Sequence, residues 1–214
     1  MIFSIFGWLV CNTLYLCNYR RDLYCEKMID LYLILMSDRP VFTIDNKPYI
    51  SAGVILYTED PRGRVHMLLQ KLTDRNQSWM WEDFGGKSEE CDNDIKDVAF
   101  RECAQELNSE AGITVKFLEE RFSDRRSTCY KIPSIKYMLY LLYVPYSFKE
   151  NTDLKVFGKM ETHDKINRVV KWVSYYDFSN IPYHDIHPRL KPSEFKVNLA
   201  LLIAKGMTEG DIFW

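Results

Sequence analysis

The chain has 214 residues, of which 47% are hydrophobic and 27% charged, a balance that is ordinary for a soluble globular protein. This length fits one domain with some additional segments. The formal net charge of −2 excludes the globally basic surface that many nucleic-acid-binding proteins carry. A nucleic-acid substrate would therefore need a local basic patch.

Six cysteines are present, and none of them forms a CxxC pair, which argues against a zinc ribbon or a thioredoxin-like motif. Three lie near the N-terminus, and Cys91, Cys103 and Cys129 fall in or near expected core elements. These three are typical of reduced, small apolar residues. A reducing compartment is indicated, and we expect a cytoplasmic protein.

The N-terminal segment over residues 2–17 is uncharged and apolar, and two arginines follow it. It is short for a membrane span, which needs about 20 residues, and a secretory signal would carry its positive charge first. Three interpretations of residues 1–35 stay open: a membrane anchor that leaves the body cytoplasmic, an amphipathic or buried helix, or an extension upstream of a start at Met28 or Met36. The domain itself is expected over residues 36–214.

Two strands are expected at the beginning of this domain. Residues 49–57 (YISAGVILY) have the β-branched and aromatic content of a strand, and residues 64–71 (RVHMLLQK) read as its hairpin partner. Between them lies Asp60-Pro-Arg-Gly, a sequence that is typical of a turn. A polar loop over residues 72–78 then leads into Trp79-Met-Trp-Glu-Asp-Phe-Gly-Gly.

A helix is expected from Asp92 to about Glu110, because N-cap candidates precede an apolar stripe that includes Ile95, Val98 and Cys103. Further strands are expected over residues 113–118, 136–144 and 169–173, and a C-terminal helix over residues 192–206. The run 136–144 (KYMLYLLYV) is the most apolar, so it is expected at the centre of the sheet. Strands flanked by helices indicate a single α/β sandwich domain.

The chemistry is expected on the central helix. Glu102 and Glu106 are four residues apart and share one helix face, and Glu110 lies one turn further along. Like charges at this spacing repel, whereas a divalent cation between them would turn repulsion into binding, and Mg²⁺ prefers oxygen ligands. Gly86 can present a carbonyl oxygen to the same cation. Arg101 can orient a carboxylate through its planar guanidinium.

The run GGKSEECDNDIKDVAFRECAQELNSEAG, from Gly85 to Gly112, resembles the Nudix box. That box is a glycine, five residues, a glutamate, seven residues, and then R-E-U-x-E-E-x-G-U, with U aliphatic. Trp81-Glu-Asp-Phe-Gly-Gly also resembles the W-E-L-P-G-G run that commonly leads into it. The resemblance extends from about Tyr49 to Phe178 and implies an α/β/α sandwich with a mixed central sheet.

The run departs from the box at three positions. Asp92 stands where the box has its first glutamate, and eight residues rather than seven separate it from Arg101. Gln105 replaces the first member of the E-E pair, and Asn108 replaces the glycine, although asparagine tolerates the left-handed conformation. A glutamine offers an oxygen without charge, so we expect a weakened or altered metal stoichiometry.

The resemblance implies a pyrophosphohydrolase that uses Mg²⁺ or Mn²⁺ to cleave a phosphoanhydride bond in a nucleoside diphosphate linked to another moiety. Arg101 would orient Glu102. The general base would be Glu106 or Glu102, with Glu161 in a later loop as the next candidate. The metal ligands implied are Gly86, Glu102, Gln105, Glu106 and Glu110.

The substrate must be held by residues outside the box. Trp79, Trp81 and Tyr137 are candidates to stack on a nucleotide base, and Arg125 and Arg126 are candidates to bind its phosphates.

Two other functions stay open. Removal of the cap from messenger RNA would need a basic groove for a capped RNA substrate. A Nudix-fold binding module with weakened catalysis is favoured by Gln105, and residues 2–17 would give it membrane contact.

Overall fold

The computed structural model describes residues 39–72, 80–107, 112–160 and 167–191. The N-terminal segment and the C-terminal helix expected over residues 192–206 lie outside these ranges, so both stay predictions. No helix in the described ranges has the length and apolar character that a membrane span requires.

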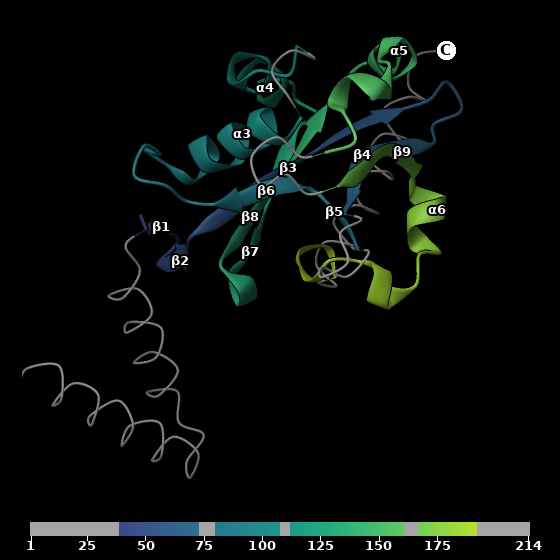
Figure 1. The fold of residues 1–214 in the computed structure, drawn as a ribbon. Coiled ribbons are helices and arrows are strands. Elements are labelled where there is room, and N and C mark those ends of the chain that lie inside the picture. Colours follow the sequence, from purple (N-terminus) through teal and green to yellow (C-terminus); the bar gives the residue numbers. More distant parts are fainter. Residues whose placement is uncertain (1–38, 73–79, 108–111, 161–166, 192–214) are drawn as a thin grey trace, which may run out of the picture. The chain divides into compact units, whose positions relative to one another are not determined.

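A mixed seven-stranded sheet forms the middle layer of the domain (Figure 1). Its central strand β3 runs parallel to β8 and antiparallel to β4, while β7 pairs with β8 and β9 pairs with β4. The strands are β3 (Ser51–Glu59), β4 (Val65–Leu72), β5 (Trp81–Glu82), β6 (Phe84–Lys87), β7 (Thr128–Ile132), β8 (Tyr137–Tyr143) and β9 (Arg168–Ser174).

The apolar strands lie where their sequences predict. Every residue of β8 is buried, as are the seven inner residues of β3, because both strands are covered on their two faces. The central position expected for residues 136–144 is therefore confirmed.

The sheet splits between β3 and β4. These strands pair only through Tyr57–Glu59 and Val65–Met67. Beyond that point β5 pairs with β4 and β6 pairs with β3. The segment over residues 81–87 therefore pairs first with β4 and then with β3. Asp83 is the single residue between β5 and β6, and it marks the change of partner.

Helices cover both faces of the sheet. On one face α3 (Ile95–Glu106), α4 (Val115–Phe122) and α5 (Tyr146–Asn151) contribute to one apolar cluster with β3 and β8. On the other face α6 (Tyr175–Ser179) and the short η5 (Pro188–Leu190) contribute Phe178 and Leu190 to a second cluster. The expected fold class, an α/β sandwich around a mixed central sheet, is confirmed.

One expected strand is wrong. Residues 113–118 do not extend a strand, because Thr114 caps α4, its Oγ1 accepting a hydrogen bond from the Phe117 amide at 3.2 Å. Burial there does not follow the two-residue alternation of a strand, since Ile113 is buried and Val115 is exposed. The remaining elements, which the sequence did not indicate, are β1 (Phe42–Ile44), β2 (Lys47–Tyr49), η2 (Pro133–Ile135), η3 (Leu154–Phe157) and η4 (Tyr183–Asp185).

Candidate active site

The candidate site lies where α3 passes over β6. Asp94 caps α3 by accepting a hydrogen bond from the Asp97 amide at 2.8 Å. Ile95, Ala99 and Cys103 are buried against the sheet, which fixes the rotation of the helix. The polar face of the same helix is thereby directed along β6.

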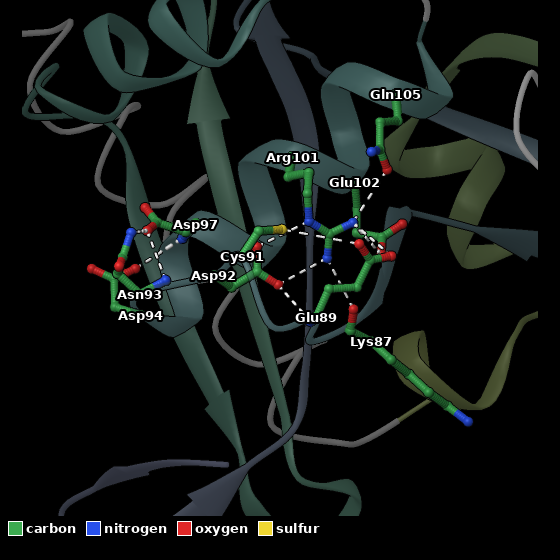
Figure 2. Close-up of polar contacts among 10 residues, drawn as sticks. All are labelled: Lys87, Glu89, Cys91, Asp92, Asn93, Asp94, Asp97, Arg101, Glu102 and Gln105. Carbon is green, nitrogen blue, oxygen red and sulfur yellow. Dashed lines mark hydrogen bonds and ion pairs between the residues drawn. The ribbon is translucent and has the colours of Figure 1, made fainter. Parts of the chain in front are cut away.

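Glu102 lies against the backbone of Gly86. A Cβ added at Gly86 would lie 2.5 Å from both carboxylate oxygens of Glu102, so a larger residue there would have to displace this side chain. Arg101 Nη1 donates to Glu102 Oε1 at 3.0 Å, which is the orienting contact expected between these neighbours (Figure 2). The structure therefore brings Gly86, Arg101 and Glu102 together.

Arg101 also binds Asp92. Its Nε and Nη2 donate to the two Asp92 carboxylate oxygens at 2.9 Å each, as Figure 2 shows. Burial disfavours the charged carboxylate, but hydrogen bonds from Arg101 and from the Glu89 amide outweigh it and lower the pKa of Asp92. Asp92 is thus a direct partner of Arg101, nine positions earlier in the chain.

Gln105 is exposed, and its Oε1 accepts from Arg101 Nη1 at 3.2 Å. In this position it shares a donor with Glu102. Three other candidates, Trp79, Glu110 and Glu161, lie outside the described residues, so their roles stay predictions.

Glu106 is held from the sheet side. Gln70, fully buried on β4, donates through Nε2 to Glu106 Oε2 at 3.1 Å and to Glu82 Oε1 at 3.3 Å. Arg168 Nη1 donates to Gln70 Oε1 at 3.1 Å, which fixes the orientation of the amide. Gln70 therefore links two carboxylates from separate elements.

The surroundings of Glu106 disfavour its charged form. Burial raises the pKa of Glu106 well above its usual value, Arg189 opposes this shift, and nearby carboxylates, including those of Glu82 and Glu102, add to it. Burial likewise raises the pKa of Glu82 to about 7, against the influence of Arg189. Both carboxyl groups are thus more easily protonated than a carboxyl group in water.

Arg189 was not identified from the sequence, where its His-Pro-Arg-Leu run reads as a structural loop. Its Nη1 donates to the Gly85 carbonyl at 2.8 Å and its Nη2 to Glu82 Oε2 at 3.1 Å. Its Nε forms an ion pair with Asp83 Oδ1 at 3.2 Å. Adjacent carboxylates at Glu82 and Asp83, buried where β5 meets β6, indicate that a buried cation is needed, but the local sequence does not identify that cation.

Along β6, the backbone carbonyls point alternately toward β3 and away from it, and only those that point away are available to other groups. Ser88 donates its amide to the Ile50 carbonyl at 2.9 Å, and Ala52 is the partner of Gly86 in the register. Because facing groups alternate along a strand, the Gly86 carbonyl turns toward β3. The Gly86 carbonyl oxygen, which we expected to be presented to a cation, therefore points toward β3 instead.

The carbonyls that turn away from β3 belong to Gly85 and Lys87. Each accepts a hydrogen bond from an arginine, from Arg189 at 2.8 Å and from Arg101 Nη2 at 3.0 Å respectively. Two arginines far apart in the sequence thus fix the backbone on either side of Gly86.

Tyr137 and Trp81, the two aromatic candidates that the structure describes, both pack against other residues of the protein. Tyr137 is 1% exposed and donates its hydroxyl hydrogen to Asp83 Oδ2, so the prediction that it stacks on a substrate base is wrong. Trp81 is half-buried, contributes to the second apolar cluster and accepts the His187 amide through its carbonyl at 2.9 Å.

The basic candidates lie away from the helix carboxylates. Arg126 donates to both oxygens of Asp124, and its guanidinium lies 3.4 Å from the centroid of the Tyr143 ring. Tyr143 and Tyr137 are the two ends of β8, a separation of roughly 20 Å for a seven-residue strand. The structure does not bring Arg126, or its exposed neighbour Arg125, to α3.

The donor set fits a hard divalent cation that completes its shell with other oxygens. In the ranges that the structure describes, no group of three or more His, Cys, Asp or Glu side chains is arranged to hold a metal. Mg²⁺ commonly uses one or two carboxylates, with waters and substrate phosphates as the other ligands. Glu102 and Glu106 supply these two carboxylates, and the missing Cβ at Gly86 leaves the place that the Glu102 carboxylate fills.

The sequence matches no protein-family model and no curated protein. Similar solved structures include an Ap4A hydrolase from C. elegans, at 18% identity and a TM-score of 0.40 over 76% of this chain and 98% of that one. RenU, a Nudix hydrolase from M. smegmatis, is 13% identical with a TM-score of 0.39 over 75% of this chain and 94% of that one.

A bifunctional NMN adenylyltransferase/ADP ribose pyrophosphatase from Francisella tularensis is 16% identical with a TM-score of 0.45, over 90% of this chain and 52% of that one. With TM-scores below 0.5, these likenesses carry no argument about activity or substrate.

Proposed function

We propose that this protein is a Nudix-type pyrophosphohydrolase that depends on Mg²⁺ or Mn²⁺ and cleaves a phosphoanhydride bond in a nucleoside diphosphate linked to another moiety. One observation carries the proposal: Glu102, oriented by Arg101, lies directly against Gly86, where its carboxylate fills the place that a Cβ would take, and Glu106 lies one helical turn away. A solvated helix face has no need of such a close approach.

The cation would be held by Glu102 and Glu106. When bound, it supplies charge neutralisation at the phosphates and lowers the pKa of an attacking water. Burial, with a further contribution from neighbouring carboxylates, raises the pKa of Glu106, and a bound cation would favour its charged form.

The protein's own residues perform the remaining tasks. Arg101 holds Glu102 in one orientation, and Gln70 holds the Oε2 oxygen of Glu106. Glu106 or Glu102 would accept the water proton. Glu161 is the next candidate for this role.

A second candidate function is a binding module of the same fold with weakened catalysis. Gln105 favours it, because this position carries no charge and its oxygen is engaged by Arg101. Such a module would bind the nucleotide and the cation without turnover.

The two functions are separated by incubating the full chain and Mg²⁺ or Mn²⁺ with nucleoside diphosphate derivatives, dinucleoside polyphosphates and capped RNA. Hydrolysis of at least one of them is expected, with a loss of about a hundredfold or more in Glu102→Gln and Glu106→Gln. Glu120→Gln, an exposed carboxylate on α4, is the matched control. Absence of hydrolysis of every substrate, or hydrolysis that both site variants retain, would overturn the enzymatic proposal.

A further inference from the structure

Arg189 contacts three separate points on the segment that leads to Gly86. It donates to the Gly85 carbonyl and to Glu82, and it pairs with Asp83. These contacts span 104 to 107 residues of sequence. They place a guanidinium from η5 in the part of the sheet where β5 gives way to β6.

A second restraint acts on the same aspartate from the other direction. Tyr137, the first residue of β8, donates its hydroxyl hydrogen to Asp83 Oδ2, and its ring lies 5.2 Å from the Arg189 guanidinium carbon. Gly53 and Gly85 make room for this hydroxyl, since a Cβ at either would overlap it. Asp83 is thus fixed between an arginine and a tyrosine.

These charges are removed from water. The Asp83 side chain is 0% exposed and that of Arg189 is 16% exposed. Burying an ion pair costs desolvation energy, and replacement by apolar residues is often neutral or stabilising, so such a pair is weak evidence of a role in stability alone. What the contacts supply in addition is a fixed backbone geometry beside Gly86.

We propose that Arg189 is a positioning residue for the active site, an inference that rests on the proposed function. By holding Glu82, Asp83 and the Gly85 carbonyl, it fixes the β6 wall of the site at the distance from α3 that Glu102 requires. Arg101 holds the other side of Gly86 through the Lys87 carbonyl. Loss of Arg189 would leave the wall restrained from one side.

The experiment compares Arg189→Met and Arg189→Lys with Arg64→Met. Arg64 is a matched control, because it also binds a buried aspartate, Asp60, but precedes β4 at the end opposite to Gln70. Each full-length variant is assayed for Mn²⁺ affinity by calorimetry, for kcat and KM separately, and for hydrogen exchange of the amides over residues 84–87.

In Arg189→Met we expect amide exchange over residues 84–87 to accelerate at least tenfold, Mn²⁺ affinity to fall at least tenfold, and kcat to fall more than KM rises. Arg189→Lys keeps the charge with fewer directed donors and should lie between the wild type and Arg189→Met. Tyr137→Phe removes only the hydroxyl contact, so it serves as the milder variant if Arg189→Met does not fold.

Each outcome decides one question. Exchange and Mn²⁺ affinity that stay at the wild-type level in the folded Arg189 variants, or that change equally in Arg64→Met, would overturn the positioning role. A wild-type protein with neither Mn²⁺ binding nor turnover would overturn the proposed function instead. The exchange comparison would then still test whether Arg189 restrains the backbone at Gly86.

Discussion

Arg101 and Asp92 form a two-pronged ion pair across the loop that leads into α3, with both N–O distances at 2.9 Å. The Asp92 side chain is 2% exposed and that of Arg101 is 14% exposed, so the pair is shielded from solvent. It joins the loop to the middle of the helix. The orientation of the arginine that contacts Glu102 therefore depends on a residue nine positions earlier.

Asp92→Asn should destabilise the protein by about 2–3 kcal/mol, because one charged partner of a shielded pair is removed while the guanidinium remains. Urea unfolding at pH 7 measures the change. Glu89→Gln is the control, since Glu89 is 47% exposed and lies 3.5 Å from Arg101, where an ion pair is worth less than about 1 kcal/mol. Equal effects of the two variants would contradict the assignment of Asp92 as the principal partner.

Gly86→Ala should abolish hydrolysis, because the added methyl group would overlap the Glu102 carboxylate and displace it. Gly63→Ala is the comparison: it meets no atom within 4 Å but places alanine at φ +73, so it should cost about 1 kcal/mol and leave activity unchanged. Activity and thermal unfolding are measured for both. Full activity in Gly86→Ala would show that the close approach of Glu102 is dispensable.

Binding of Mn²⁺ should release protons from Glu106. A raised pKa keeps the carboxyl protonated to higher pH, and a cation favours the charged form, so affinity should increase as pH rises toward that pKa. Calorimetry at one pH in two buffers of different ionisation enthalpy gives the number of protons released. The release should disappear in Glu106→Gln and persist in Glu120→Gln; identical release in all three proteins would place the titrating group elsewhere.

His187 should make the fold sensitive to acid. Burial, with a further contribution from Arg189, lowers the pKa of His187 from 6.5 to about 4, so the folded state favours the neutral ring. The neutral ring therefore contributes to the stability of the fold above pH 6.5. This contribution is lost as the pH falls toward 4, by about 1–2 kcal/mol between pH 7.5 and 5. His187→Asn keeps an N-cap for η5 and removes the titration.

Denaturant unfolding of both proteins at both pH values tests this. A wild-type protein and a His187→Asn variant that lose the same stability between these pH values would refute the role of His187.

Local patterns were sufficient for β3, β4, β8 and α3, but they did not indicate the short strands β5 and β6. The apolar runs of β3, β4 and β8 and the stripe along α3 each lie within a few consecutive residues, and burial follows them. Arg101, Glu102 and Gly86 could be associated because the spacing of one continuous motif brings them together.

The remaining features depend on distant parts of the chain. Arg189 reaches Gly85 from 104 residues away, and no local pattern distinguishes it from a surface arginine. Tyr137 reads as an exposed stacking residue only until the register of β8 buries it beside Asp83. Around Val115 the apolar content suggested a strand, but the Thr114 hydroxyl caps a helix there.

Because the chain changes its partner strand at Asp83, an inserted residue would have different effects before and after Gly86. On the N-terminal side, β5 and β6 are each in register with a different strand, so one added residue would shift every facing pair and turn side chains to the opposite face of the sheet. On the C-terminal side, residues 88–94 belong to no strand, and Arg101 reaches Asp92 across this loop. We therefore expect an added residue to disturb the sheet more before Gly86 than after it.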